Sequence, residues 1–262
     1  CNDVNQMCGE GFAEFFPSRD YNLQNTLSSS HETEHQRLNV LANLAMEKCK
    51  VVFSSIEAAC SITIPKDILI SSTITIKNDK EYKISEIVDF LVKTGYTACD
   101  QVEGKCQFAK RGGIIDIFPP NLKNPVRIEF WGDEIDSLSY FEVDTQRRTE
   151  PLKSFTITPA REVLINEPHQ LVLKLEQIKQ TLKGKYAKEQ RETIDTDIEN
   201  IKENVSINNQ DKFIKLLYGN NSIFDYFKGE VFVLSSQNEA TEALKNVLWQ
   251  KRDMTMQRKY IE

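Results

Sequence analysis

Three carboxylates lie within four residues of one another, at Asp133, Glu134 and Asp136. A cluster of this kind can hold a metal ion and support metal-dependent nuclease chemistry. The preceding Gly132 and Asp133 are, however, typical of a hairpin turn, where acidic residues are common for backbone reasons. We favour the turn and keep a nuclease as an alternative hypothesis.

Metal-ligating residues are few and scattered. The chain has six cysteines without C-x-x-C spacing, and only three histidines. His31 and His35 are one helical turn apart, a spacing that can bind metal, but no third ligand accompanies them. The neighbouring Glu32 and Glu34 favour a solvated first turn of a helix. We therefore predict no metal site, and we expect reduced thiols in a cytoplasmic protein.

The sequence lacks the usual motifs of nucleotide-binding proteins. No G-x-x-x-x-G-K-[ST] loop is present, and Gly184-Lys185 falls between two predicted helices. A predicted strand at 231–234 is followed by Ser235 and Ser236, where an ATPase would need a carboxylate to hold its metal ion. We predict neither catalytic residues nor a bound cofactor for this stretch of chain.

The run 126–131 alternates apolar and polar residues, as strands with one buried face do. Its apolar members should point into a core, which leaves Arg127, Glu129 and Trp131 on the opposite face. Arg111, beside a Gly-Gly turn, joins that face if the two strands pair. Because Trp and Arg dominate binding hot spots, this face is a candidate protein interface.

A second interpretation of the same pattern stays open at this point. Trp131 can instead pack beneath a helix, while Arg127 pairs with Glu129 on a solvated face. The alternation alone does not separate the two.

The elements that carry these residues fall into three predicted domains. Strands and helices alternate over 12–60, which favours a parallel α/β layer in a first domain, 1–74. In the second domain, 75–158, a helix opening at 84 precedes strands at 113–118, 126–131, 136–142 and 154–158. This pattern predicts an antiparallel α+β domain.

The third predicted domain, 159–262, is mostly helical. Apolar residues recur at helical spacing over 168–183, 187–204 and 212–218, and a last helix is expected over 238–258. The chain begins at Cys1 inside an element, so we expect it to be a piece of a longer protein whose missing N-terminus supplies the first strand and helix.

The net charge of −6 and the pI near 5.4 argue against a free-standing nucleic-acid-binding module. No apolar run is long enough to predict a membrane span. A DNA-binding scaffold is therefore disfavoured, and steep salt dependence of DNA affinity would revive it.

Several long motifs closely resemble the bacterial transcription-repair coupling factor (Mfd) family. They are GYTACDQVEGKCQF, FAKRGGIIDIFPP, VRIEFWGDEIDSL, FEVDTQRR, FFPSRDYN, ETEHQRLNVLANL, SSIEAACSITIP and ITPAREVL. The resemblance covers nearly the whole chain and is strongest over 95–162. It implies a UvrB-like module at the N-terminus of such a factor: a degenerate RecA-like layer of the P-loop NTPase type, with an inserted α+β domain.

The resemblance also implies partners and site residues. Residues 75–158 would bind UvrA through Arg111, Arg127 and Trp131, where the family commonly has Phe at the last position. The strand alternation adds Glu129 to this predicted site. RNA polymerase, double-stranded DNA, ATP and Mg²⁺ would be bound by other parts of the full-length ATP-driven translocase, and the C-terminal region is thought to mask the UvrA face. A fragment of a UvrB-like excision ATPase is the alternative.

Overall fold

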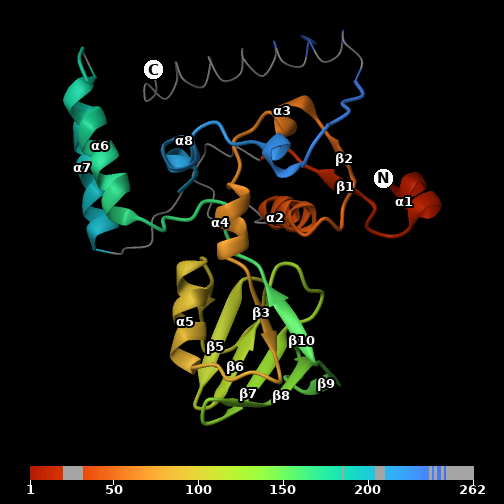
Figure 1. Ribbon diagram of the computed structural model, residues 1–262. Coiled ribbons are helices and arrows are strands. Elements are labelled where there is room, and N and C mark those ends of the chain that lie inside the picture. Colours follow the sequence, from red (N-terminus) through yellow and green to blue (C-terminus); the bar gives the residue numbers. More distant parts are fainter. Residues whose placement is uncertain are drawn as a thin grey trace. The chain divides into compact units, whose positions relative to one another are not determined.

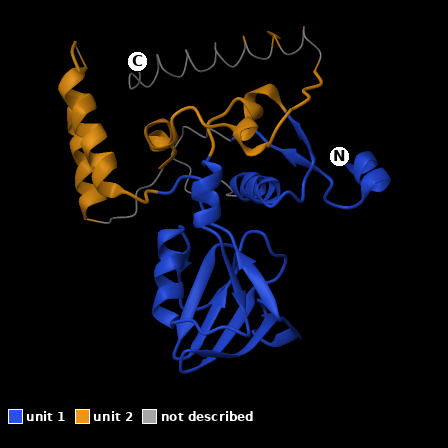
Figure 2. Ribbon diagram, in the orientation of Figure 1, with its two compact units in different colours: residues 1–54, 64–164 blue, residues 55–63, 165–262 orange. Residues whose placement is uncertain are grey.

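The computed structural model describes residues 1–19, 32–184, 186–203 and 210–235, together with 238, 241, 242 and 245. The chain divides into two compact units, which Figure 2 colours separately. Unit 1 holds residues 1–54 and 64–164, and unit 2 holds 55–63 and 165–262. The domain boundaries expected from the sequence stay a prediction.

The first part of unit 1 is a strand–helix–strand arrangement (Figure 1). Strands β1 (Ala13–Phe16) and β2 (Val51–Ser54) pair in parallel, and α2 (Glu32–Ala45) connects them along the chain. The leucines of α2 recur three residues apart and are buried, as on the core-facing side of an amphipathic helix: Leu38, Leu41 and Leu44. A short helix α1 (Asn2–Cys8) precedes β1 and was not expected.

The remainder of unit 1 is a predominantly antiparallel sheet with one covering helix (Figure 1). Its six strands follow one another in chain order, and only the first pair, β4 with β5, is parallel. The strands are β4 (Thr97–Ala98), β5 (Gln107–Arg111), β6 (Ile114–Ile117), β7 (Val126–Trp131), β8 (Glu134–Phe141) and β9 (Arg148–Pro151). The predicted strands at 113–118, 126–131 and 136–142 form the centre of this meander, to which β4 and β9 are additions. The predicted strand at 154–158 exists as well, but it lies outside this sheet.

A second antiparallel pair joins the entry and exit of this sheet region. Strand β3 (Ile74–Lys77) pairs with β10 (Ser154–Ile157), so Ile74 lies opposite Ile157. Helix α4 (Lys66–Ser71), which the sequence pattern missed, leads into β3. The chain therefore enters and leaves through neighbouring strands.

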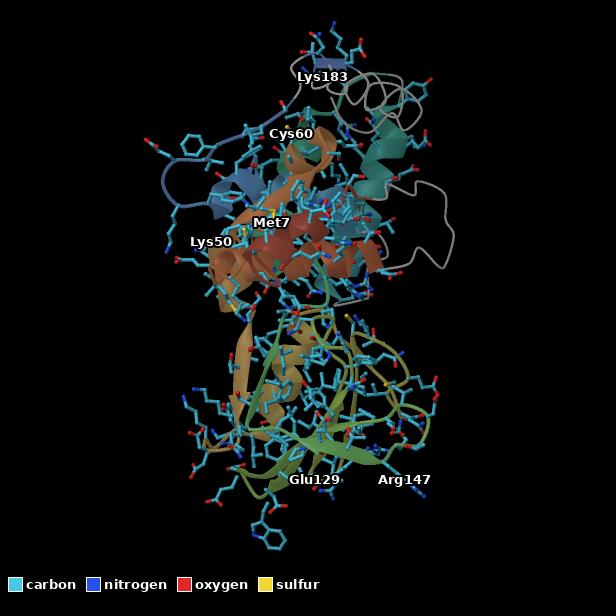
Figure 3. The ribbon with its side chains drawn as sticks, turned by 90° about the vertical axis from the view of Figure 1, so that its right-hand side faces the viewer. Met7, Lys50, Cys60, Glu129, Arg147 and Lys183 are labelled. Atoms are coloured by element: carbon cyan, nitrogen blue, oxygen red, sulfur yellow. The ribbon has the colours of Figure 1, made fainter. Side chains whose placement is uncertain are left out.

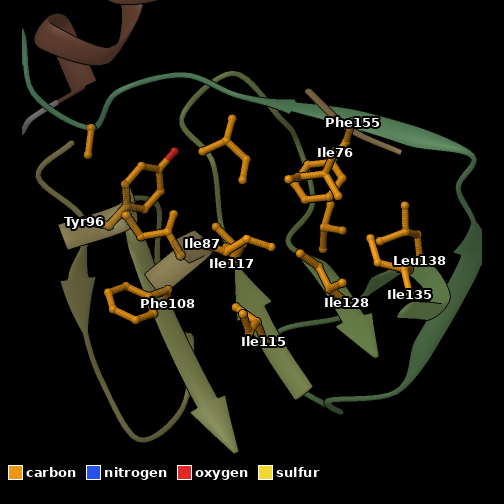
Figure 4. Close-up of a cluster of buried hydrophobic side chains, with 14 residues drawn as sticks. Ile76, Ile87, Tyr96, Phe108, Ile115, Ile117, Ile128, Ile135, Leu138 and Phe155 are labelled. Carbon is orange, nitrogen blue, oxygen red and sulfur yellow. The ribbon is translucent and has the colours of Figure 1, made fainter. Parts of the chain in front are cut away.

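Helix α5 (Ile84–Lys93) packs on one face of the six-stranded sheet, and Figure 4 shows the buried side chains gathered there. Ile87 and Leu91 of this helix pack with alternate residues of the strands, including Ile115 and Ile128. The Tyr96 hydroxyl, buried in this cluster, donates a hydrogen bond of 2.7 Å to the carbonyl of Thr158. One face of the six-stranded sheet is therefore buried in the core.

A buried ion pair ties α2 to the chain that follows β10. The Arg37 guanidinium is fully buried, and its Nε and Nη2 lie 2.9 and 3.1 Å from the Glu162 carboxylate. Its Nη1 donates to the Pro17 carbonyl at 2.7 Å, and its face stacks on the Phe16 ring. Arg19 also contacts Glu162, at 2.9 Å.

The regular elements described in unit 2 are helical. Helices α6 (Pro168–Thr181) and α7 (Ala187–Lys202) match the predicted spans, and 3-10 turn η1 (Gln210–Phe213) runs into α8 (Ile214–Tyr218). A hydrophobic cluster in this unit is formed by Leu171, Leu175, Ile198, Ile201 and Phe213. Short elements α3 (Ile56–Ala59) and η2 (Ile223–Tyr226) complete it, and the Thr63 amide donates to the Asn221 carbonyl at 3.0 Å.

The predicted strand at 231–234 is wrong. These residues have no regular structure and are exposed, with Phe232 at 87% and Leu234 at 98%. No strand in the described ranges pairs with them, so their β propensity has no ladder to join. The helix expected over 238–258 falls almost wholly outside the described residues.

Among the described residues, no helix is both long and apolar enough to cross a membrane.

Candidate interaction face on the six-stranded sheet

The face of the sheet turned away from α5 carries the polar residues singled out in the sequence. Strand pairing places Asp116 of β6 opposite both Ala109 of β5 and Arg127 of β7, and Arg127 opposite Ser139 of β8. Because side chains directly opposite one another share a face, these four residues form one row across four strands. We call this surface the polar face of the sheet.

Asp116 lies at the centre of the polar face and is fully buried. Its Oδ1 accepts from Arg127 Nε at 2.7 Å, and its Oδ2 accepts from Arg127 Nη2 at 2.8 Å. Oδ2 also accepts from Arg111 Nη2. A single carboxylate therefore holds two guanidinium groups side by side. Arg111 does join the face, as pairing of its strand required.

The Arg127 side chain is enclosed by its neighbours and is not exposed at the surface as a free group. Its side chain is only 13% exposed, its Nη1 donates to the Gln146 carbonyl at 3.1 Å, and its guanidinium lies 4.8 Å from the centre of the Phe141 ring. The hydrogen bond with Asp116 raises the pKa of Arg127 further above its usual range. Arg127 lies on the predicted face, but it is largely covered because the neighbouring strand supplies the buried acid Asp116.

Glu129 pairs with a residue that the sequence pattern did not single out. Its carboxylate lies 2.8 Å from Arg148 Nη1 on β9 and accepts a 2.8 Å hydrogen bond from the Ser137 hydroxyl. The alternative pairing of Glu129 with Arg127 is therefore wrong. Figure 3 marks Glu129 and Arg147, the residue before Arg148, toward the end of the sheet. The adjacent arginines at 147 and 148 were the sequence feature that could have indicated a basic partner for Glu129.

Trp131 projects from the end of β7 with 83% of its surface exposed. A bulge between Glu129 and Phe130 shifts the register with β8, and Gly132, with φ of 65°, opens the tight turn that follows. The interpretation that Trp131 packs under a helix is wrong. An isolated bridge between Glu81 and Glu134 flanks this hairpin tip.

The turn before β6 explains the Arg-Gly-Gly motif. Gly112 has a φ of 59°, a conformation that side-chain-bearing residues rarely adopt. A Cβ on Gly113 would lie 3.0 Å from the Phe130 carbonyl oxygen, and the Phe130 amide donates to the Gly113 carbonyl at 2.8 Å. The two glycines therefore permit the hairpin that brings Arg111 over Asp116.

A small apolar cluster adjoins these charges. Its buried members are Val102, Ala109, Phe118 and Phe141. The Gln146 side chain closes over it by donating to the carbonyls of Val143 at 2.7 Å and Val102 at 3.4 Å. The guanidinium of Arg127 therefore packs against apolar side chains, which limits its access to water.

The other candidate sites do not assemble. Asp133, Glu134 and Asp136 are exposed around the predicted turn, and no group of three metal-ligating side chains comes together in the described part of the chain. His31 lies outside the described residues.

Cys106 and His35 do meet, at a pocket of about 220 Å³, with Sγ 3.1 Å from Nε2. Burial, reinforced by Glu34, raises the pKa of the Cys106 thiol to about 12, so it is protonated at neutral pH. A protonated thiol is a poor nucleophile and a poor metal ligand. All six cysteines are free.

Comparison with known proteins places this face inside a recognised domain. Residues 74–163 match the model of the UvrB interaction domain. The chain is 30% identical, over 86% of its length, to the transcription-repair-coupling factor of Bacillus subtilis, of which it spans 20%.

Two further relatives agree with this match. The transcription-repair-coupling factor of Mycobacterium bovis is 39% identical over 36% of the chain and 8% of that protein. The UvrABC system protein B of Campylobacter hominis is 24% identical over 82% of the chain and 35% of that protein.

Proposed function

We propose that residues 74–163, which are a UvrB interaction domain, dock this chain onto UvrA. In this proposal the chain is the N-terminal, UvrB-like module of a transcription-repair coupling factor and recruits UvrA in transcription-coupled nucleotide excision repair. The observation that carries it is the Arg111–Asp116–Arg127 cluster lying in the matched domain together with the exposed Trp131.

The chemistry of the polar face indicates what its partner must present. Arg111 and Arg148 are about half exposed, at 47% and 52%, although the chain as a whole is acidic. Exposed guanidinium groups bind carboxylates in pairs of parallel hydrogen bonds. An 83% exposed tryptophan gains most by entering an apolar pocket. The matching surface on UvrA would combine acidic residues with such a pocket.

The parallel β1–α2–β2 arrangement supports a second part of the proposal, that residues 1–74 form a degenerate RecA-like layer. The sequence has no G-x-x-x-x-G-K-[ST] loop, which supports a scaffold without ATPase chemistry. RNA polymerase, DNA, ATP and Mg²⁺ would be handled by other parts of a longer cytoplasmic protein, since the chain spans only a fifth of its Bacillus subtilis relative.

The test is titration calorimetry of the chain with purified UvrA. Trp131→Ala is expected to weaken binding by about 2 kcal/mol, or roughly thirtyfold, as the loss of an aromatic hot spot does. Phe232→Ala is the matched control, because Phe232 is as exposed, at 87%, but lies in unit 2. Equal affinity of wild type and Trp131→Ala would contradict the assignment of this face.

A UvrB-like excision protein is the second candidate, because a UvrABC system protein B is among the relatives. Both candidates dock UvrA, so binding does not separate them. An ATPase assay with Mg²⁺ does: turnover by this chain would favour the second candidate, and its absence agrees with the scaffold proposed above.

A further inference from the structure

We propose that the pocket lined by His35 and Cys106 binds a phosphate group, either as free phosphate or as a small phosphomonoester. The pocket has a volume of about 220 Å³ and lies within unit 1. Sites that enclose a drug-sized ligand measure roughly 300–1,000 Å³, so this pocket has room for a phosphate group with little attached to it. The proposal is independent of docking to UvrA.

The lining of this pocket is basic although the chain as a whole is acidic, with a net charge of −6. Lys105 and Arg161 both line it, His35 forms part of its wall, and none of its described lining residues is acidic. Two positive charges beside one small hollow attract an anion more strongly than the same charges on an open surface, because less water screens them.

The Cys106 thiol reports how these charges act inside the pocket. Burial and Glu34 raise the pKa of this thiol to about 12, whereas Arg161 and Lys105 both lower it. The two cations therefore favour negative charge at the position of Sγ. The thiol itself is protonated at neutral pH, so it brings no negative charge to the pocket. Glu34 lies behind the lining, and its Oε1 accepts from the Glu162 amide at 2.7 Å.

The neutral groups of the lining also favour a ligand rich in hydrogen-bond acceptors. Gln107 Oε1 accepts from the amides of Glu103 at 2.8 Å and Gly104 at 3.0 Å. Both bonds require the side-chain oxygen, so the NH₂ of Gln107 is left to donate. Thr97 adds a hydroxyl group to the same lining. Phosphate oxygens accept hydrogen bonds from amide, hydroxyl and ammonium groups alike.

Two contacts hold the cations beside the pocket. Lys105 Nζ donates to the Pro120 carbonyl at 3.0 Å, which uses one of its three N–H groups. The Arg161 side chain crosses Gly95 so closely that a Cβ on residue 95 would lie 2.6 Å from Arg161 Cγ. Gly95, with φ of 89°, therefore provides the space that Arg161 occupies. Groups that are already in place lose less freedom when a ligand binds.

A nucleic-acid backbone is a less suitable source of the phosphate. A phosphodiester carries a nucleotide on each side of the phosphate, and a pocket of 220 Å³ does not hold them. The net charge of −6 also repels a polyanion, whereas a single phosphate group responds mainly to the charges nearest to it.

The experiment is an NMR titration of the whole ¹⁵N-labelled chain with inorganic phosphate, with sodium chloride adjusted to keep the ionic strength constant. The amide signals of Thr97 and Gln107, which line the pocket, should shift and reach saturation. The amide signals of β9, which contributes nothing to the lining, should stay in place.

Substitutions then test the two cations. Lys105→Gln and Arg161→Gln should each weaken phosphate binding about tenfold, the loss expected for a hydrogen bond to a charged group. Lys110→Gln is the matched control, because Lys110 is an exposed lysine of β5 that does not line the pocket. This control should bind phosphate as tightly as the wild type.

Competition identifies the source of the phosphate group. Displacement of inorganic phosphate by AMP would assign a phosphomonoester, and retention of inorganic phosphate in the presence of AMP would assign free phosphate. An oligothymidylate without a terminal phosphate should not compete. Displacement by this oligonucleotide would overturn the proposal in favour of a nucleic-acid backbone.

Two other results would also overturn the proposal. One is a wild-type titration without saturation at Thr97 and Gln107, and the other is wild-type affinity in both Lys105→Gln and Arg161→Gln. If Arg161→Gln does not fold, Lys105→Gln decides alone, because Lys105 is an exposed residue whose replacement leaves the core intact. Unchanged phosphate affinity in that variant would then refute the site.

Discussion

Replacing Glu162 by glutamine is expected to destabilise unit 1 strongly. The carboxylate is 1% exposed and lies 2.9 Å from the fully buried Arg37. Removing the charge from one member of a buried pair leaves the other uncompensated, which costs about 3–5 kcal/mol. A glutamine keeps one acceptor oxygen for Arg37, so we expect the lower end of this range, about 3 kcal/mol.

The measurement is guanidinium denaturation followed by circular dichroism, with the free energy of unfolding extrapolated to water. Glu86→Gln is the control, because Glu86 forms an exposed pair with Lys83 at 3.4 Å. Exposed pairs contribute little, so the control should lose less than about 0.5 kcal/mol.

A small effect of Glu162→Gln would refute this reasoning. A loss below about 1 kcal/mol would mean that water or a rearranged side chain compensates the Arg37 charge. The double variant Arg37→Met with Glu162→Gln should recover part of the lost stability, since it removes one of the two buried guanidinium charges beside Glu162 and leaves that of Arg19.

Three further predictions concern single groups. Tyr96→Phe removes the buried 2.7 Å hydrogen bond to Thr158 and should lower the free energy of unfolding by about 1 kcal/mol; no change in denaturation would contradict it. Gly112→Ala, at φ of 59°, should cost about 1 kcal/mol in thermal unfolding, and a stabilised variant would contradict the turn geometry. With its pKa raised to about 12, Cys106 should be alkylated at pH 8 at least about 100-fold more slowly than exposed Cys60, and its rate should keep rising up to pH 12; equal labelling by mass spectrometry would contradict this.

Much of unit 1 was predictable because its signals are local. The leucine spacing of α2 and the alternation in β7 are periodicities that a short window of sequence contains. The turn at Gly132 was recognisable for the same reason. The mixed α/β character and the meander followed from these patterns.

The partners on the polar face were not predictable in the same way. Strands β6 and β7 are joined by an irregular connection whose length does not determine the register, so nothing local places Asp116 opposite Arg127. Strand β9 is short and wholly exposed, which removes the alternation that would reveal it and the pairing of Arg148 with Glu129. Residues 231–234 show the opposite failure, since strand propensity without a neighbour produces no strand.

The pairing of β3 with β10 makes the sheet region portable. With Ile74 directly opposite Ile157, the two ends of an 84-residue stretch lie side by side, joined by a ladder of backbone hydrogen bonds. A segment closed in this way can be inserted into a surface loop of a host domain, because the two host residues that flank the insertion stay close together. The same closure would let one domain of this kind be inserted into different host proteins.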